Sequence, residues 1–394
     1  MTHKISDKIF AFLPKEDIEE AALTQIMNTA SMPFLFHHVA VMPDTHYGKG
    51  STVGTVLPTR GAVIPAAVGV DIGCGMIAVE TAISPRNVED KLHDIRLGIE
   101  RRIPMSAGKF NRKITDSAAR RISELEVMPG VETAEALSKN WREQLGTLGG
   151  GNHFIELCID TENRVWATLH SGSRGVGNKI GNHYIKIAQE IAQKNFVQLP
   201  DRDLAYLVEG SQEFDAYIRD MRWAQHFALL NREEMLDRFM MELSQAVLGD
   251  HTRGADLEKE RINCHHNFTQ IEHHMGADVW ITRKGAIKAT EADYCMIPGS
   301  MGTRSYIVKG RGNIPSFCSA PHGAGRKFSR AAARKQFTMA DFDKAMVGIE
   351  HRRTDILLDE IPGAYKNIDE VMENAKDLVE VVTTLRQVLN VKGD

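Results

Sequence analysis

Apolar positions divide the chain into segments with a helical period and shorter segments that resemble strands. Residues 15–30 carry Ile18, Ala22, Ile26 and Met27 at helical spacing after Pro14, which predicts a helix. Residues 179–194 and 212–248 are also predicted to be helical. The second of these carries an aromatic, aliphatic and Met stripe: Phe214, Tyr217, Ile218, Met221, Trp223, Phe227 and Leu230. Such a stripe is typical of a helix in a core or at a helix–helix seam.

Short apolar runs bounded by glycine or proline predict strands at 38–42, 51–57, 62–70, 76–83 and 165–169. Further helices are predicted at 259–275, 327–349 and 366–377, and a last apolar segment follows at 378–391. Strands are irregularly spaced among the helices, without regular βαβ alternation, so the expected fold class is α+β. We expect one large domain over residues 1–394, with 86–143 and 179–250 as largely helical, peripheral insertions.

Composition narrows the class of protein. The 394 residues include 48 basic and 52 acidic side chains, a formal charge of −4, which excludes a uniformly basic nucleic-acid coat but allows a local basic groove. Mean hydropathy is −0.28 and no apolar run approaches the length of a membrane span, so no membrane association is expected. The first ten residues lack the apolar core of a signal peptide. Five scattered cysteines without a CxxC pair indicate reduced thiols in the cytoplasm.

The segment VGVDIGCGM, residues 68–76, is the first of several glycine-framed segments that carry reactive side chains. Asp71 and Cys74 lie three residues apart, and the surrounding glycines permit a tight turn that aims both at one point. A carboxylate and a thiolate together suit a divalent transition metal, and a thiolate can bridge two ions. A structural cysteine beside a turn aspartate remains the alternative.

Two further segments supply a histidine each. In GTLGGGNHFIE, residues 146–156, a glycine run precedes His153 at a loop-to-strand junction, and such a run lets backbone N–H groups approach phosphate oxygens. In LHSGSRGVGN, residues 169–178, His170 ends a strand and Arg174 follows among serines and glycines. Arginine beside hydroxyl groups is a recurring phosphate-binding arrangement. Taken singly, either histidine could equally be a hydrogen-bonded structural residue.

The segment INCHHN, residues 262–267, adds two adjacent histidines and a cysteine. Neighbouring side chains point in different directions on a helix or a strand, so His265 and His266 are not expected to serve one site together, and spacing does not choose between them. Cys264 is a further candidate ligand without a partner cysteine. One Asp, one Cys and three His would form a two-metal site with a bridging ligand.

Two later segments point to a nucleotide. IPGSMGTRSY, residues 297–306, offers small residues and hydroxyl groups, and PHGAGR, residues 321–326, presents His322 before a glycine loop. A histidine in this setting can be a nucleophile, because imidazole can attack the α-phosphorus of a nucleoside triphosphate to form a phosphoramidate. A loop histidine bonded to backbone is the alternative.

Together these segments resemble the RtcB family of GTP-dependent RNA ligases, from MPDTHYGKGSTVG at residues 42–54 to VKG at residues 391–393. The resemblance implies a single α+β domain whose β-sheets line a deep active-site cleft. It implies an enzyme of tRNA splicing or RNA repair that joins an RNA 3′-phosphate or 2′,3′-cyclic phosphate to a 5′-hydroxyl. GTP would be the cosubstrate, two Mn²⁺ ions the cofactor and histidine–GMP the covalent intermediate. Some bacteria carry a second copy of this enzyme associated with a release-factor homologue, and such a link would apply if this chain is one of those copies.

The resemblance also implies roles for individual residues. Asp71 and His153 would bind the first metal, His170 and His266 the second, and Cys74 would bridge them. His266 is chosen over His265 because the family's ligand directly precedes an asparagine, here Asn267. His322 would be the guanylylated nucleophile and Asp44 an acid near the RNA end. The GMP contacts would be Asn152, His153, Phe154, Ile155, Glu156, His266, Asn267, Pro298, Gly299, Ser300, Met301, Ser305, His322, Gly323, Ala324, Gly325 and Lys392.

Local positive charge for RNA phosphates is expected from Lys49, Arg174, Arg283 and Lys284. Two other functions fit parts of the pattern. A binuclear-metal phosphoesterase acting on RNA ends would use the same metal ligands, but it has no need for the HGAG segment or a lysine at position 392. A non-catalytic RNA-binding module would need neither, and the aromatic motif of an RRM is absent. Manganese and GTP follow from the resemblance alone, since zinc would bind these ligands more tightly.

Overall fold

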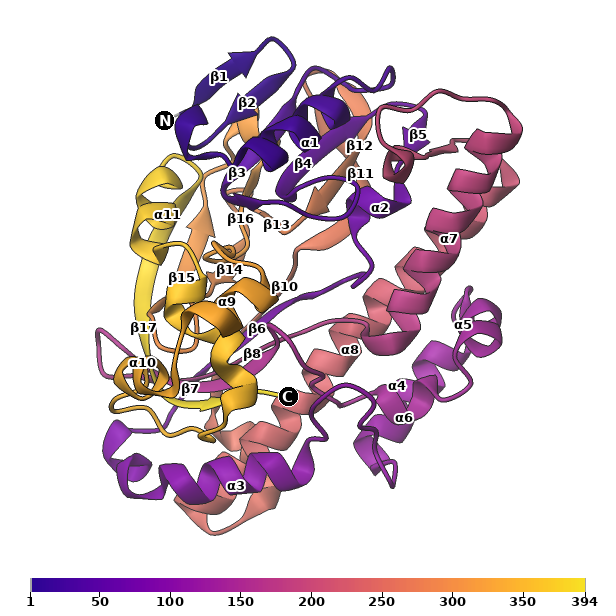
Figure 1. Cartoon of the computed structure of the whole chain (residues 1–394). Coiled ribbons are helices and arrows are strands. Elements are labelled where there is room, and N and C mark those ends of the chain that lie inside the picture. Colours follow the sequence, from indigo (N-terminus) through magenta and orange to yellow (C-terminus); the bar gives the residue numbers. More distant parts are fainter. Residues whose placement is uncertain (1, 394) are drawn as a thin grey trace.

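The computed structural model describes residues 2–393 and is organised around two β-sheets (Figure 1). The first sheet has the strand order β1-β2-β3-β4-β12-β11. All its pairings are antiparallel except the parallel pair β2 and β3. Its strands are β1 His3–Ser6, β2 Ile9–Ala11, β3 Val39–His46, β4 Val53–Thr59, β11 Asn267–His274 and β12 Ala277–Lys284.

The second sheet is fully antiparallel, with the order β10-β6-β8-β7-β17-β15-β14. Its strands are β6 Gly75–Thr81, β7 Phe154–Asp160, β8 Val165–Ser171, β10 Glu258–His265, β14 Tyr294–Ile297, β15 Ser305–Gly310 and β17 Val379–Val391. The neighbouring strands β6, β8 and β7 are buried along almost their whole length. This two-sided burial explains why their sequences are nearly continuous apolar runs.

Two short pairs complete the strands: β13 Ala286–Lys288 with β16 Ser319–Pro321, and β5 Ala62–Val63 with β9 Leu207–Val208. The α-helices are α1 Glu20–Ala30, α2 Pro65–Val68, α3 Leu92–Arg102, α4 Asp116–Glu126, α5 Val131–Leu137, α6 Trp141–Gln144, α7 Arg174–Lys194, α8 Gln212–Leu248, α9 Arg330–Gln336, α10 Met339–Ala345 and α11 Ile368–Asn374. The mixture confirms the α+β class. No helix within residues 2–393 combines the length and the apolar character needed to cross a bilayer.

Helix α8 is the longest element and packs along α7 and against β6 and β8 (Figure 1). It begins where the Ser211 side chain accepts the backbone N–H of Phe214, and it ends at Gly249 in the left-handed conformation. Every member of the stripe from Phe214 to Leu230 is buried, which confirms its assignment to the core.

The segment 86–143 is helical as expected and rests on α8 through aromatic side chains. The Trp141 ring meets the Trp223 ring edge-on at 5.2 Å, and Trp223 stacks on Phe227 at 5.6 Å. Trp223 Nε1 also donates to the carbonyl of Leu125 in α4. These contacts attach α4 and α6 to the same helix that supports the second sheet.

Three predictions from periodicity were wrong. Residues 259–275, predicted as a helix, form most of β10 and β11, because β6 and β12 supply pairing partners that override local pattern. Of the strand predicted at 62–70, only β5 forms, because Pro65 opens the short helix α2. The helix predicted at 327–349 is two short helices, since Thr338 caps α10 through a reciprocal bond with Asp341.

Candidate active site

The reactive side chains meet at one end of the second sheet. Cys74 directly precedes β6, His153 directly precedes β7, and His170 lies near the end of β8. Because β8 is antiparallel to both neighbours, its end lies beside their beginnings. His266 stands between β10 and β11, where the chain passes from the second sheet to the first. The sheet pairing therefore gathers residues that are far apart in sequence.

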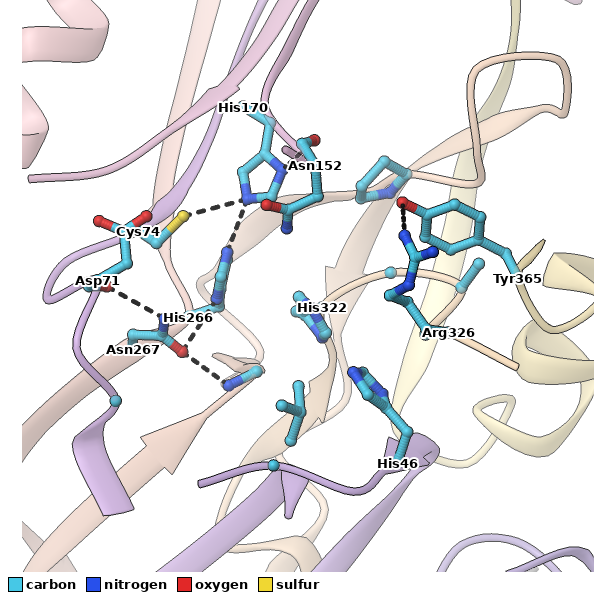
Figure 2. A pocket seen from close by; sticks show the side chains of 18 of the residues that line it. His46, Asp71, Cys74, Asn152, His170, His266, Asn267, His322, Arg326 and Tyr365 are labelled. Atoms are coloured by element: carbon cyan, nitrogen blue, oxygen red, sulfur yellow. Dashed lines mark hydrogen bonds between the residues drawn. The ribbon is translucent and has the colours of Figure 1, made fainter. Parts of the chain in front are cut away.

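These residues form a continuous series of contacts with the cysteine at its centre, and Figure 2 shows the part from Cys74 through His170 to His266. Asp71 Oδ2 lies 3.1 Å from His153 Nε2, and that nitrogen lies 3.5 Å from Cys74 Sγ. On the other side, Cys74 Sγ lies 3.2 Å from His170 Nε2, which lies 2.9 Å from His266 Nε2. We call these five residues the ligand cluster. The sulfur contacts one imidazole on each side, as a bridging ligand would.

The imidazole rings of the ligand cluster are oriented for metal binding. Nδ1 faces an oxygen acceptor in each: the Leu148 carbonyl at 2.9 Å from His153, the Asn152 carbonyl at 3.3 Å from His170, and Asn267 Oδ1 at 3.3 Å from His266. A neutral ring that donates from Nδ1 has a bare lone pair at Nε2. The three Nε2 atoms converge with a sulfur and a carboxylate. Imidazole nitrogens, a sulfur and a carboxylate that converge in this way form a donor set that fits divalent transition metals.

Electrostatics support the same assignment. Burial holds the pKa of His170 and of His266 well below the usual value, so both rings are neutral at neutral pH, as metal ligation would require. Burial alone would raise the pKa of Asp71, but the contact with His153 and the positive charge of Arg174 outweigh it and bring that pKa to about 2. Burial and the Asp71 charge raise the pKa of the Cys74 thiol, so a bound cation is required to make it a thiolate.

His322 follows β16 and is fixed by the buried carboxylate of Asp44 in β3. Asp44 Oδ2 accepts the His322 backbone N–H at 3.1 Å and faces ring Nδ1 at 2.6 Å. Nδ1 therefore carries the proton, and Nε2 is a free nucleophilic lone pair. The approach needs Gly325, because a methyl group there would lie 2.2 Å from the Asp44 carbonyl, and its φ of +72° favours glycine. The His322 ring lies 4.7 Å from the ring of His266 (Figure 2).

A cavity of about 380 Å³ opens between the two sheets and joins the ligand cluster to His322. Its lining includes most of the residues expected to contact a nucleotide: Asn152, Phe154, Glu156, His266, Asn267, Pro298, Gly299, Ser300, Met301, Ser305, His322, Gly323, Ala324, Gly325 and Lys392. Two expected contacts do not line it. His153 lies behind Cys74, and the Ile155 side chain packs in the core of the second sheet.

One wall of the cavity was not anticipated from the sequence. The Glu360 carboxylate, 2% exposed, lies 2.9 Å from Lys392 Nζ and accepts from the Tyr365 hydroxyl at 2.6 Å. Its other oxygen is bonded to Arg326 at 3.1 Å and to Arg330 at 2.6 Å. Arg326 could have been found, since it directly follows HGAG. Arg330, Glu360 and Tyr365 sit in segments without a motif, and only tertiary packing brings them to Arg326 and Lys392.

His46, at the end of β3, is a further unanticipated lining residue (Figure 2). Its Nδ1 lies 3.0 Å from the carbonyl of Asp44, and burial lowers its pKa to about 4. The ring is thus neutral beside His322. Its signal in the sequence was its place in MPDTHYG, two residues after Asp44.

The four residues expected to contact RNA phosphates lie in different environments. Lys49 is exposed at the cavity rim. Lys284 lines the cavity, but its ammonium donates to the carbonyls of Lys49, Ser51 and Ala66, and burial lowers its pKa to about 7. The prediction that Arg283 contacts RNA phosphates was wrong. Its side chain is fully buried against Glu272, Ser319 and the Phe317 carbonyl, so it cannot reach a phosphate.

Arg174 lies beside the ligand cluster rather than in the cavity lining. Its Nε donates to Thr147 Oγ1 at 3.2 Å, and its positive charge helps to lower the pKa of Asp71. Its backbone has a φ of +57°, a conformation that costs energy outside glycine and is concentrated at functional sites.

The two remaining candidates for metal ligation face elsewhere. His265 Nδ1 lies 3.0 Å from the Gly73 carbonyl and 3.0 Å from the Arg232 guanidinium. The Cys264 side chain packs in the core beside Cys295. His266 is thus the member of the adjacent pair that joins the ligand cluster.

Comparison with known proteins agrees with this geometry. The family model described as tRNA-splicing ligase RtcB matches residues 25–393. The chain belongs to the RtcB family. Among RtcB relatives, the RNA-splicing ligase RtcB of Escherichia coli strain K12 is 47% identical over 390 residues, 95% of each chain.

More distant RtcB relatives come from archaea. The tRNA-splicing ligase RtcB of Methanococcus maripaludis is 29% identical over 429 residues, covering 92% of this chain and 89% of the relative. That of Thermococcus kodakarensis is 29% identical over 444 residues, covering 95% and 92%. Each of these RtcB proteins is named as a splicing ligase.

Proposed function

We propose that this RtcB-family chain is an RNA ligase of tRNA splicing or RNA repair. It joins an RNA 3′-phosphate, or a 2′,3′-cyclic phosphate first opened to it by water, to a 5′-hydroxyl, with GTP as cosubstrate. The observation that carries the proposal is the pairing of Asp44 with His322, which leaves a nucleophilic Nε2 beside a five-residue ligand cluster in one cavity. A phosphoesterase would use the ligand cluster but has no use for an activated imidazole.

In the first step, His322 Nε2 attacks the α-phosphorus of GTP, a P–N bond forms, and the bond to the β-phosphate oxygen breaks to release pyrophosphate. The ring becomes positively charged as it reacts. Asp44 stabilises that charge through Nδ1, at 2.6 Å, and keeps the ring in the reactive tautomer. The proton stays on Nδ1 throughout, so no external base is needed.

In the second step, an oxygen of the RNA 3′-phosphate attacks the phosphorus of histidine–GMP, and His322 leaves as the neutral imidazole. The product is an RNA–(3′)pp(5′)G end. In the third step, the 5′-hydroxyl oxygen attacks the 3′-phosphorus and its proton passes to solvent. The new P–O bond forms as the bond to the bridging oxygen breaks, and GMP departs with that oxygen. The intermediate is needed because a phosphate monoester dianion is a poor electrophile that lacks a good leaving group.

The protein offers positive charge on two sides of these reactions. Arg174 lies beside the ligand cluster, and Arg326, Arg330 and Lys392 form the opposite wall of the cavity. Preorganised cations stabilise charge that develops on phosphoryl oxygens. Two Mn²⁺ ions, held by Asp71 and His153 on one side of Cys74 and by His170 and His266 on the other, would supply further neutralisation. The sulfur ligand also argues for a reducing compartment, and we infer a cytoplasmic location.

The test is incubation of the protein with α-labelled GTP and Mn²⁺, followed by sealing of a 3′-phosphate RNA strand to a 5′-hydroxyl strand. We expect a covalent label that acid removes and alkali does not, since protonation of nitrogen weakens a phosphoramidate bond. ATP under the same conditions is the control for nucleotide choice. Release of inorganic phosphate from the RNA end without labelling or sealing would establish the phosphoesterase instead.

A further inference from the structure

The connection between α3 and α4 is fastened beside the ligand cluster. The Ser106 backbone N–H donates to the Gly149 carbonyl at 2.9 Å, and the Leu148 N–H donates to the Pro104 carbonyl at 2.9 Å. Asn111 Nδ2 donates to the Leu145 carbonyl at 2.7 Å. The glycine-rich segment held in this way leads directly into Asn152 and His153. Figure 1 shows this connection beside the C-terminal end of the described chain.

The part of this connection formed by residues 107–113, which we call the basic loop, carries unpaired positive charge. Lys109, Arg112 and Lys113 are exposed, and no ion pair to any of them occurs within residues 2–393. By contrast, Arg142 in the nearby α6 is paired with Glu126 and Glu135. A cluster of unneutralised cations on a chain of net charge −4 is typical of a phosphate-binding surface.

Phe110 lies among these cations, 39% exposed. An aromatic ring that is left in solvent between basic side chains provides a surface on which a base can stack while the cations contact the flanking phosphates. The alternation of Lys109, Phe110, Arg112 and Lys113 along one short loop supplies both elements of single-strand recognition.

Residues 149–151 lead from the segment that anchors the basic loop to the cavity. Gly149 is buried against Arg174, since a methyl group there would lie 1.9 Å from Arg174 Nη1. Gly151 is partly exposed, and a methyl group there would lie 3.0 Å from Arg330 Nη2. A sugar–phosphate backbone can approach a glycine without a side chain closely, and at Gly151 the Arg330 guanidinium lies beside it.

We propose that the basic loop binds single-stranded RNA a few nucleotides from the reacting end. Lys109, Arg112 and Lys113 contact phosphates, a base stacks on Phe110, and the strand passes Gly151 to enter the cavity beside the ligand cluster. This inference rests on the proposed function, because it takes RNA as the substrate, and it specifies where the strand runs outside the cavity.

The test compares Arg112→Ala/Lys113→Ala with a matched control, Lys8→Ala/Lys15→Ala. The control lysines are also exposed and lie beside β1 and β2 and before α1, at the opposite end of the molecule (Figure 1). Binding of a 20-nucleotide RNA with a 3′-phosphate is measured by fluorescence anisotropy over a range of salt concentrations. Each lost phosphate contact lowers the log–log salt slope by roughly 0.7, so we expect a reduction of about 1.4 for the loop variant and no change for the control.

Stacking is tested separately with Phe110→Ala and Phe110→Trp. We expect roughly tenfold weaker binding of the long RNA by the first and wild-type binding by the second. Neither loop variant should weaken the use of a dinucleotide with a 3′-phosphate, because that substrate does not reach the loop. Extending the 3′-phosphate strand and the 5′-hydroxyl strand in separate experiments identifies which of the two crosses the loop.

The inference fails if wild-type protein seals RNA but the loop variants retain its affinity and salt slope, or if only binding of an acidic peptide is weakened. Labelling by GTP in each variant verifies that the cavity is intact. Failure of the proposed function is distinguishable, because the wild-type protein would then neither label nor seal.

Discussion

His322 and the histidines of the ligand cluster all direct Nδ1 at an oxygen atom, and the identity of that oxygen separates their roles. His153 and His170 direct Nδ1 at backbone carbonyls, whereas His322 directs it at a carboxylate. A carbonyl fixes a ring orientation, while a carboxylate also stabilises positive charge that develops during nucleophilic attack. The chemistry of Nε2 is thus set by the residue on the opposite side of each ring.

The first prediction concerns His322→Ala. This variant should lose the covalent GMP label completely but retain its metal, because His322 is not among the ligand cluster. It should still seal RNA supplied with a pre-formed RNA–(3′)pp(5′)G end, since the last step does not use the imidazole. Gel assays with labelled GTP and with pre-activated RNA check both outcomes. A label that persists in the variant would show that another residue is the nucleophile.

The second prediction concerns Cys74→Ala. Because its sulfur contacts His153 on one side and His170 on the other, removing it should release more metal than His153→Ala or His266→Ala does. Elemental analysis after dialysis against Mn²⁺ gives the stoichiometry. Two tightly held ions in Cys74→Ala would contradict the bridging role.

Among the structural elements, α8 has a role beyond filling the core. Asn231, fully buried, accepts the N–H groups of Gly146 at 2.7 Å and Thr147 at 3.2 Å, and it donates to the Gly172 carbonyl at 3.2 Å. The adjacent Arg232 donates to the carbonyls of Gly73 at 2.8 Å and Ser171 at 3.0 Å. One helical turn therefore holds the loops that carry Asp71, His153 and His170.

The third prediction follows from the hydrogen bonds that Asn231 makes to these loops. Asn231→Ala would leave two buried N–H groups without acceptors, at a cost of roughly 1–3 kcal/mol each. We expect a lower free energy of unfolding in urea and a weaker affinity for Mn²⁺. Asn231→Asp keeps an acceptor for the two N–H groups but loses the donors. Its stability and its affinity for Mn²⁺ should therefore lie between those of the wild-type protein and Asn231→Ala. Unchanged metal affinity in a clearly destabilised Asn231→Ala would restrict the role of Asn231 to folding.

The elements also show what the sequence could and could not predict. Cys74, His153 and His170 were found because each lies where a glycine-framed turn meets a strand, a feature visible locally. Glu360 and Tyr365 were missed because their meeting with Lys392 depends on packing between distant segments. β10 and β11 were mistaken for a helix because strand pairing with β6 and β12 is not encoded in their own periodicity.

At the scale of the whole molecule, burial of ionisable groups makes stability depend on pH, and this gives the fourth prediction. Burial lowers the pKa of His46 to about 4 and of His265 to about 3, so at pH 5–6 only the unfolded chain protonates them. Burial raises the pKa of Glu156 to about 8, so between pH 5 and pH 6 the folded chain keeps this carboxyl protonated while the unfolded chain mostly does not. This proton on the folded chain cancels one of the protons that the histidines bind on the unfolded chain. His170 and His266, whose pKa values burial also lowers, add to the histidine side, so the unfolded chain binds at least one proton more than the folded chain.

The metal-free protein should therefore lose at least about 1.4 kcal/mol of stability per pH unit as pH falls from 6 to 5. Urea unfolding in the presence of a chelator at the two pH values measures this difference. His46→Gln should reduce the pH dependence by about one proton, and Lys8→Ala should leave it unchanged. Equal stability at pH 5 and pH 6 would contradict the neutral state of these buried histidines.

The position of strand β17 affects how the chain folds during synthesis. It is the last strand in chain order, yet it lies between β7 and β15 in the interior of the second sheet. A growing chain on the ribosome can arrange β6, β7 and β8 early, but β7 and β15 keep open inner edges until residues 379–391 have emerged, and open edges invite pairing between chains. Lys392 arrives with the same strand. A chain whose synthesis has not reached β17 would thus lack both an interior strand of the second sheet and Lys392 in the cavity wall. The risk of aggregation through open strand edges and the lack of activity would end at the same point of synthesis.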